Sequence, residues 1–327
     1  MLRDRHNRSI NYLRISITDR CNLRCRYCMP EQGVVKLDHK EILTYEEILK
    51  IVRAASSQGI TKVRLTGGEP LVRKGLVDFI AELSRLPEKL DLRLTTNGVL
   101  LADLAEDLVR AGLQRINVSL DTLDRRTFEV ITGRDELNRV WRGIEAALSL
   151  GFDRIKINCV PIRGFNDQEI ESFVNLTREL PLDVRFIEFM PLGRREWWSP
   201  DKLVTSDEIM TRVNKLGALI SEIREENEGP AVVYRLAGAR GRIGFISPIS
   251  HLFCDTCNRL RLTADGKLRL CLLSELEVDL RTRLRRGVNQ EELEVMIREA
   301  VKLKPSSHPL THETGLIPGR TMNLIGG

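Results

Sequence analysis

The chain has 327 residues, of which 42% are hydrophobic, 30% charged and 5% aromatic, and its formal net charge is +5. The apolar fraction is enough for a packed core and excludes a disordered chain, and the low aromatic content disfavours a base-stacking nucleic-acid module. No apolar stretch reaches the length of a membrane span, and residues 1–6 contain no apolar signal segment. We therefore expect a cytoplasmic protein whose partners include no membrane and no nucleic acid.

Short strand-like runs alternate with helix-like runs over the first part of the chain. This pattern predicts an α/β fold with a parallel sheet. Strands are expected at residues 12–18, 62–66, 92–96, 115–120, 154–160 and 184–189. Helices are expected at residues 45–57, 75–84, 101–111, 140–150 and 167–180.

Apolar and polar residues alternate within these strands. In the first strand Leu13 and Ile15 alternate with Arg14 and Ser16. Since successive side chains point to opposite faces of a sheet, one face packs against helices and the other is polar and basic. A half-exposed antiparallel sheet would show the same alternation, but the intervening helices favour a curved parallel sheet around a cationic cavity. Because uncompensated buried charge is costly, we expect this cavity to hold an anionic ligand.

The pattern changes beyond about residue 190. A helix is expected at residues 206–216, and Asp265-Gly266 is typical of a hairpin turn. Strands are expected at 219–224, 232–236, 242–246, 259–263 and 267–271, helices at 277–284 and 290–303, and an extended, flexible end at 319–327.

The seven cysteines form two groups of three, with Cys159 alone. An odd number disfavours a disulfide framework, and grouped thiolates indicate zinc or an iron–sulfur cluster. Cys21, Cys25 and Cys28 have the spacing C-x3-C-x2-C directly after the first strand, where barrel loops build active sites. Three thiolates hold three irons of a cubane cluster and leave the fourth iron open. A zinc site completed by a distant Cys or His is the alternative.

This first triplet resembles the radical S-adenosylmethionine (SAM) superfamily, because Tyr27 precedes the third cysteine and Gly67-Gly68-Glu69-Pro70 follows the second strand. The resemblance implies a [4Fe–4S] cluster whose open iron binds SAM. One-electron reduction then cleaves SAM and gives a 5′-deoxyadenosyl radical, which abstracts hydrogen from the substrate. The resemblance also implies a partial (β/α)6 barrel of the radical SAM type, in agreement with the six strand–helix units.

The second triplet, Cys254, Cys257 and Cys271, has the spacing C-x2-C-x13-C. His251 lies three residues upstream of Cys254. Considered apart from the rest of the chain, these four residues are typical of a structural zinc site of the Cys3His type. Arg259 and Arg261 follow on one side of a predicted strand, and paired arginines are well suited to phosphate.

The whole chain resembles the GTP 3′,8-cyclase family of molybdenum cofactor biosynthesis, a family of radical SAM lyases. The matching stretches are residues 12–16, 64–70, 95–98, 116–121, 185–190, 253–261 and the terminal 326–327. The resemblance implies a second [4Fe–4S] cluster at the second triplet, whose open iron binds the guanine of GTP. The implied product is (8S)-3′,8-cyclo-7,8-dihydroguanosine 5′-triphosphate. It further implies a radical SAM core at residues 5–220 and a C-terminal α+β region at 221–327, which carries the second cluster and closes the barrel mouth.

The family also implies roles for single residues. The positions that match SAM contacts are Tyr27, Gly68, Ser119 and Met190. The positions that match GTP contacts are Arg14, Arg64, Thr95, Lys156, Arg259 and Arg261, with Lys62 and Arg185 as further basic residues of the cavity. Gly326 and Gly327 are expected to enter the active site on the tail. Cys159 is expected to be a buried structural thiol.

The implied partners are GTP, an external one-electron donor and a second copy of the chain in a homodimer, with the product passed to the cyclic pyranopterin monophosphate synthase.

Two other functions are compatible with parts of the sequence. One is a peptide-modifying radical SAM enzyme with an auxiliary cluster, although such enzymes often carry more C-terminal cysteines. The other is a metal-stapled RNA-binding module, which predicts zinc and a salt-sensitive affinity for RNA.

Overall fold

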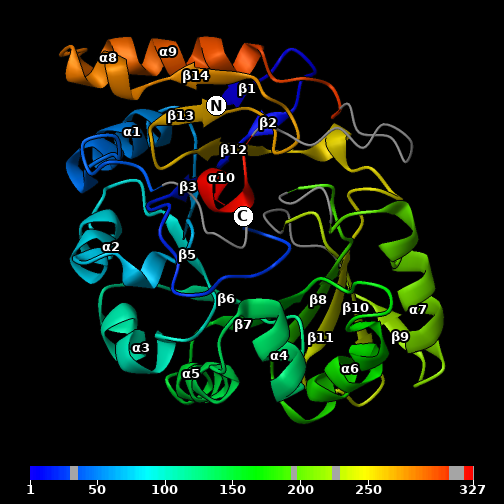
Figure 1. Cartoon of the computed structure of the whole chain (residues 1–327). Coiled ribbons are helices and arrows are strands. Elements are labelled where there is room, and N and C mark those ends of the chain that lie inside the picture. The colour runs from blue at the N-terminus through cyan, green and yellow to red at the C-terminus, as the bar shows by residue number, and fades with distance from the viewer. Residues whose placement is uncertain (30–35, 193–196, 223–228, 309–319, 327) are drawn as a thin grey trace.

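The computed structural model describes residues 1–29, 36–192, 197–222, 229–308 and 320–326, and most of its strands form one twelve-stranded sheet (Figure 1). In spatial order the strands are β14 (Glu277–Asp279), β13 (Lys267–Arg269), β12 (Arg259–Leu262), β3 (Tyr12–Ser16), β4 (Lys62–Thr66), β5 (Asp91–Thr96), β6 (Arg115–Ser119), β7 (Arg154–Cys159), β8 (Asp183–Ile187), β11 (Arg242–Ile246), β10 (Val232–Leu236) and β9 (Leu219–Ser221).

The middle of this sheet, from β12 to β11, is parallel, and β13, β14, β10 and β9 add antiparallel edges. Within the described residues β14 and β9 do not pair, so the curved sheet is an open, partial barrel. The six predicted strands of the first part of the chain are confirmed. The C-terminal region widens this core on both sides, because β12 pairs with β3 and β11 pairs with β8.

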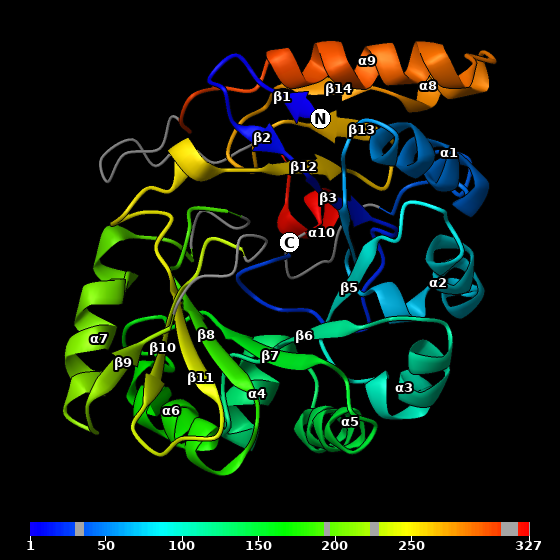
Figure 2. The same ribbon diagram turned by 180° about the vertical axis from the view of Figure 1, so that it is seen from behind.

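Helices surround the curved sheet on its outer side (Figure 2). Helix α1 begins at a capping box, in which the Thr44 side chain accepts from the Glu47 N–H and the Glu47 carboxylate accepts from the Thr44 N–H. Its buried face includes Ile48, Ile51 and Val52. The main helices are α1 (Tyr45–Ser56), α2 (Leu76–Ser84), α3 (Leu101–Arg110), α4 (Arg125–Thr132), α5 (Leu137–Ser149), α6 (Ile170–Glu179), α7 (Ser206–Asn214) and α9 (Gln290–Lys302).

Short elements complete the chain. β1 and β2 form a small antiparallel hairpin at the N-terminus. Four short 3-10 helices, η1 to η4, lie between the longer elements of the described chain. These elements are β1 (Leu2–Arg3), β2 (Ser9–Ile10), η1 (Pro70–Val72), η2 (Asp167–Glu169), η3 (Pro200–Lys202), η4 (Cys254–Thr256), α8 (Arg281–Arg285) and α10 (Met322–Ile325).

Two local predictions are wrong, and one helix was not predicted. The expected helix at 277–284 begins as edge strand β14, because residues 277–279 pair with β13, and only α8 is helical. The expected extended end contains the helix α10, in which Asn323 and Ile325 are buried. Helix α4, whose first turn is capped by Asp124, is absent from the sequence-based expectation. The expected strand at 219–224 ends at Ser221, and its last residues lie outside the described part of the chain.

The apolar side of the parallel strands forms the core. Leu13, Ile15, Val63 and Leu65 are at most 1% exposed and pack with the buried faces of the helices. The described residues contain no helix that is both long and apolar enough to cross a membrane. The polar side of the same strands faces the interior of the barrel, where the functional residues gather.

Candidate functional site

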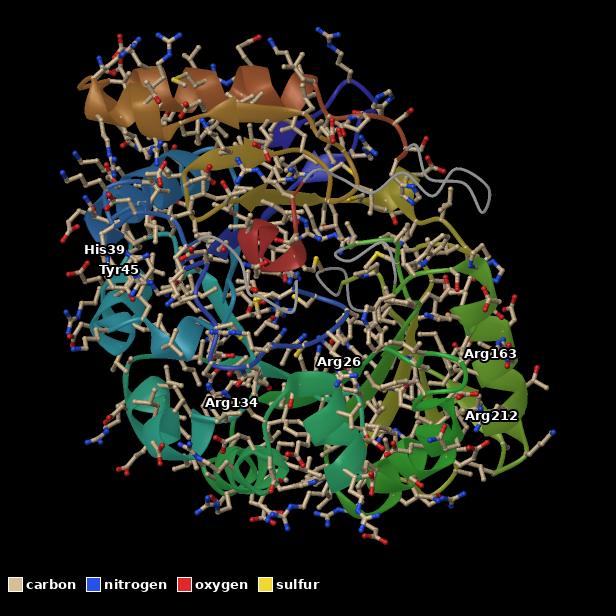
Figure 3. All side chains as sticks on the ribbon, viewed as in Figure 1. Arg26, His39, Tyr45, Arg134, Arg163 and Arg212 are labelled. Atoms are coloured by element: carbon tan, nitrogen blue, oxygen red, sulfur yellow. The ribbon has the colours of Figure 1, made fainter. Side chains whose placement is uncertain are left out.

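One large cavity lies inside the barrel, with a volume of about 340 Å³. In Figure 3, sulfur atoms lie close to α10 in the middle of the ring of helices. Both cysteine triplets line this cavity, although their sequence positions are far apart. The predicted residues that also line it are Tyr27, Gly68, Ser119, Met190, Arg14, Arg64, Thr95, Arg185, Arg259 and Arg261.

The first triplet lies on the loop that follows β3. The Cys28 N–H donates to the carbonyl oxygen of Cys25 at 3.0 Å, which tightens the loop, and all three cysteines line the cavity. The backbone of the same loop is supported by the end of α4, since the N–H of Arg24 donates to the Thr132 carbonyl oxygen at 2.7 Å. The helix that the sequence did not predict thus supports the first triplet.

At the thiols of the first triplet the effect of burial outweighs that of nearby positive charge, and the pKa of Cys21 is raised although Arg24 opposes this. Burial raises the pKa of Cys28 to about 12, with a further contribution from Cys21, and burial raises the pKa of Cys25 well above its usual value. A thiol in such a place becomes a thiolate when a metal supplies the missing positive charge. The donor set therefore fits a metal cluster.

Gly67 and Gly68 hold the base of this loop against β4. Gly67 has φ of +151°, and a Cβ there would lie 2.5 Å from the carbonyl oxygen of Thr18. A Cβ on Gly68 would lie 2.4 Å from the carbonyl oxygen of Arg20, so neither position has room for a side chain. This close approach explains why the run requires glycine.

Glu69 joins this run to β5. Its carboxylate accepts from Thr96 Oγ1 at 2.7 Å, the Asn97 N–H at 2.7 Å and the Leu71 N–H at 3.0 Å. Burial raises the pKa of Glu69 to about 7, and the three hydrogen bonds oppose this increase. Glu69 therefore fixes the backbone that faces the first triplet.

Asp121 orients Tyr27, and sequence reasoning did not assign it to the site. The Tyr27 hydroxyl donates to Asp121 Oδ2 at 2.6 Å, and the Val160 N–H donates to Asp121 Oδ1 at 2.9 Å. The ring of Tyr27 also packs edge-on against Phe189, with centroids 6.3 Å apart. Asp121 follows Ser119 on the polar side of its strand, so the alternation of side chains could have identified it.

A row of four arginines crosses the polar side of the sheet. Arg261 is in register with Arg14, Arg14 with Arg64, and Arg64 with Arg93, so the four side chains emerge on one face. All four line the cavity, and Arg64, Arg93 and Arg261 are buried. The prediction that basic side chains of the parallel strands line an interior cavity is thus confirmed.

Burial and mutual repulsion lower the pKa values of two arginines of this row. Burial lowers the pKa of Arg14 to about 10, and the neighbouring Arg64 and Arg259 add to this effect. Burial, Arg14 and Arg259 lower the pKa of Arg261 well below its usual value. Arg93 pairs with Asp91, with Nη2 and Oδ2 2.5 Å apart. At the outer edge of the molecule, Arg163 and Arg212, labelled in Figure 3, pair with Glu208 and Glu171.

Tyr12 lies at one end of this charge cluster. Arg64 Nε donates to the Tyr12 hydroxyl at 2.5 Å, and Arg64 Nη1 donates to Thr95 Oγ1 at 3.1 Å. Burial opposes ionisation of Tyr12, but the charges of Arg64 and Arg14 lower its pKa to about 7. Partial ionisation of this phenol compensates part of the positive charge.

Several buried polar atoms of the cavity have no hydrogen-bond partner within the described chain. They are Nη1 of Arg261 and Oδ1 of both Asn117 and Asn158. Buried polar groups are nearly always hydrogen-bonded, so unsatisfied atoms on a cavity wall indicate a polar ligand.

The second triplet lines the same cavity from the C-terminal part of the chain. Cys254 is in the turn η4, Cys257 precedes β12, and Cys271 follows β13. Burial opposes ionisation of Cys257, but the charges of Arg259 and Lys304 lower its pKa to about 6. Unlike the first triplet, the second therefore contains a thiol that ionises readily.

The zinc alternative fits this geometry poorly. His251 is exposed, and its Nε2 lies 2.8 Å from Asp207 Oδ2. Among the described residues, no three His, Cys, Asp or Glu side chains meet at a point that suits a single metal ion. A cubane cluster binds each cysteine at a different iron, so its ligands need not converge on one point.

Lys62 and Lys156 do not line the cavity, although both are buried. The ammonium of Lys62 lies 5.1 Å from the ring centroid of Tyr12. Lys156 is in register with Asp183. Burial opposes ionisation of that carboxyl, but its bond to Arg242 and, to a smaller extent, the charge of Lys156 lower its pKa. The contact of Lys156 with GTP and the place of Lys62 among the basic residues of the cavity stay predictions. Cys159 is buried, and its Sγ lies 3.7 Å from the Asp121 carbonyl oxygen.

The C-terminal tail reaches the cavity, whose lining includes Met322 and Asn323. Asn323 Nδ2 donates to the Asp19 carbonyl oxygen at 3.3 Å, and Met322 packs against Leu192 and Leu273. A Cβ on Gly326 would lie 2.8 Å from the Cβ of Ser16. The tail thus reaches the strand that carries the first triplet, while Gly327 lies outside the described residues.

The comparisons with known proteins agree with this site. Residues 15–177 match the family model of the radical SAM superfamily, and residues 182–310 match that of Molybdenum Cofactor Synthesis C. The chain is 49% identical to the GTP 3′,8-cyclase of Desulforamulus reducens over 99% of both chains. It is 49% identical to that of Thermodesulfovibrio yellowstonii and 47% identical to that of Alkaliphilus metalliredigens, over 100% of each chain.

Among solved structures, Streptococcus suis SuiB bound to S-adenosylmethionine has a similar fold. The TM-score is 0.59 at 16% identity, and the match covers 84% of this chain and 64% of SuiB. For SuiB bound to its precursor peptide SuiA the TM-score is 0.57 at 15% identity, and the match covers 90% of this chain and 68% of SuiB. This similarity shows the radical SAM fold alone, whereas the end-to-end identity to the cyclases shows the family. The chain belongs to the GTP 3′,8-cyclase family of the radical SAM superfamily.

Proposed function

We propose that the chain is a GTP 3′,8-cyclase that converts GTP to (8S)-3′,8-cyclo-7,8-dihydroguanosine 5′-triphosphate in molybdenum cofactor biosynthesis. The observation that carries this proposal is the arginine row, because Arg261, Arg14, Arg64 and Arg93 line one cavity together with both cysteine triplets. A metal-stapled RNA-binding module would have no use for such an interior row.

The arginine row supports a triphosphate as ligand. Guanidinium groups bind phosphate oxygens through paired hydrogen bonds, and such charge-assisted bonds are strong. The guanidiniums of Arg14, Arg259 and Arg261 repel one another, and Arg261 Nη1 has no hydrogen-bond partner among the described residues. A bound triphosphate would satisfy this atom and offset the repulsion. The same residues would place the ribose between the two triplets.

The residues of the first triplet would hold a [4Fe–4S] cluster, and those of the second triplet another. The first cluster and SAM supply the one-electron chemistry that removes hydrogen from the substrate. Tyr27, Gly68, Ser119 and Met190 would bind SAM, and the Asp121–Tyr27 hydrogen bond keeps the aromatic ring oriented at that place. The role of the protein is to orient the reactants and exclude water while the cofactors supply the reactive chemistry.

The wider assignments are also part of the proposal. We infer a division into a core at residues 5–220 and a C-terminal region at 221–327, although strands of both parts share one sheet. We further infer a cytoplasmic homodimer that receives single electrons from an external donor. Its product would pass to the cyclic pyranopterin monophosphate synthase.

The test is anaerobic incubation of the iron-loaded chain with SAM, GTP and a low-potential reductant. The product is an isomer of GTP, so it must be identified by chromatography and fragmentation. Cys21→Ala should abolish both SAM cleavage and product, whereas Cys271→Ala should mainly abolish product. A chain that binds zinc and forms no cyclised nucleotide would exclude the proposed function.

A further inference from the structure

Two buried cations from opposite ends of the chain lie beside the second triplet. Arg8 is 7% exposed and Lys304 is 3% exposed. Neither follows from the cysteine spacing or from the alternation of the strands. Lysine and arginine are almost never buried unless they are paired, so their partners indicate what they do.

Lys304 connects the segments that carry Cys257 and Cys271. Its Nζ donates to the carbonyl oxygen of Leu270 at 2.5 Å and to that of Arg259 at 3.0 Å. Leu270 directly precedes Cys271, and Arg259 is two positions after Cys257. A single ammonium therefore fixes the distance between these two parts of the triplet.

Arg8 holds the remaining cysteine. Its Nη1 donates to the carbonyl oxygens of Cys254 and Ser306, both at 2.8 Å, and its Nη2 donates to that of Pro305 at 2.5 Å. Arg8 Nε donates to Asp4 Oδ2 at 2.6 Å, which fixes the guanidinium. Because Pro305 and Ser306 directly follow Lys304, the two cations belong to one framework.

Lys304 brings a buried positive charge beside the second triplet. It is 3% exposed, and its Nζ bonds to the backbone directly before Cys271 and two positions after Cys257. Positive charge stabilises the more negative, reduced form of an iron–sulfur cluster, and the net charge and hydrogen bonds around a cluster set its potential.

We propose that Lys304 and Arg8 are positioning residues of the second triplet, which hold its three segments in register and make the reduction potential of its cluster less negative. This inference rests on the proposed function, since it requires a cluster at that place. It predicts that removing the Lys304 charge changes the second cluster and leaves the first cluster unaffected.

The test uses three full-length variants. Lys304→Gln keeps an N–H donor for the carbonyls but removes the charge, and Lys304→Met removes both. Lys302→Met is the matched control, because Lys302 is an exposed lysine at the end of α9, two positions before Lys304, and pairs with Glu299. Iron and sulfide per chain, the cluster potential by redox titration with electron paramagnetic resonance, and SAM cleavage are measured for each. A background with Cys21, Cys25 and Cys28 changed to alanine reports the second cluster alone.

The wild-type chain and Lys302→Met should bind roughly eight irons, as two cubane clusters require. Lys304→Gln should keep this content but shift the second potential to a more negative value. Lys304→Met should lose up to half of the iron while SAM cleavage continues. If both Lys304 variants keep the wild-type iron content and the reduction potential of the second cluster is unchanged, this inference is overturned but the proposed function is not. Zinc at the second triplet of the wild-type chain would overturn the proposed function as well.

Discussion

Replacing Arg261 with methionine should stabilise the ligand-free chain and weaken its binding of GTP. Arg261 is 5% exposed, lies in register with Arg14 and has an unsatisfied Nη1. Leaving a buried donor unsatisfied costs about 1–3 kcal/mol. Methionine replaces the aliphatic stem and adapts to irregular space, so most of the packing is retained. The substitution therefore removes the unsatisfied donor and one repulsive charge.

The size of the effect follows from the length of the chain. An unfolding entropy of about 2.1 cal/mol/K per residue gives roughly 0.7 kcal/mol/K for 327 residues. A gain of about 1–3 kcal/mol then raises the melting temperature by about 1.5–4 °C. Loss of a hydrogen bond to a charged phosphate, worth about 1.5–3 kcal/mol, weakens GTP binding by roughly 10- to 150-fold.

Thermal unfolding by circular dichroism, with and without GTP, measures the first effect, and titration calorimetry measures the second. Arg283→Met is the matched control, because Arg283 is an exposed arginine of α8. It should change neither quantity. A variant Arg261→Met that melts below the wild-type chain, or that binds GTP with wild-type affinity, would refute the reasoning about the arginine row.

Three further predictions concern other parts of the site. The folded pKa of Tyr12, about 7, lies below the usual value of about 10, so its ionisation contributes stability that is present above pH 10 and lost as the pH falls through 7. One tyrosinate absorbance should appear near pH 7 and be absent in Tyr12→Phe; its persistence there would assign it to another tyrosine. Glu69→Gln should lower stability by about 1–3 kcal/mol, measured by thermal unfolding, because an amide N–H would face backbone N–H donors; an equal melting temperature contradicts this. Arg320→Met should speed proteolysis of the tail, because Arg320 pairs with Asp265 and Glu277 at 3.0 Å; unchanged cleavage would show that other contacts hold α10.

Much of the site could be predicted because its signals are local. Alternation along a strand identified the polar side that carries Arg14 and Arg64, and cysteine spacing identified both triplets. The same local rules failed where tertiary pairing decides the structure. Residues 277–279 have an amphipathic pattern that suits a helix, yet they form an edge strand because β13 offers a pairing partner. The tail contains no strong helical pattern, yet Asn323 and Ile325 are buried in a short helix.

The sequence by itself determined the parallel α/β core, the two cysteine triplets and the cationic side of the strands, because each depends on patterns and short spacings between residues that are near in the chain. Only the tertiary structure decided which cations meet. Pairing of β12 with β3 brings Arg261 beside Arg14, and Arg8 reaches Cys254 across 246 positions. Such contacts leave no periodic signal in the chain, since they depend on the order of strands in the sheet and on where the two ends of the chain pack.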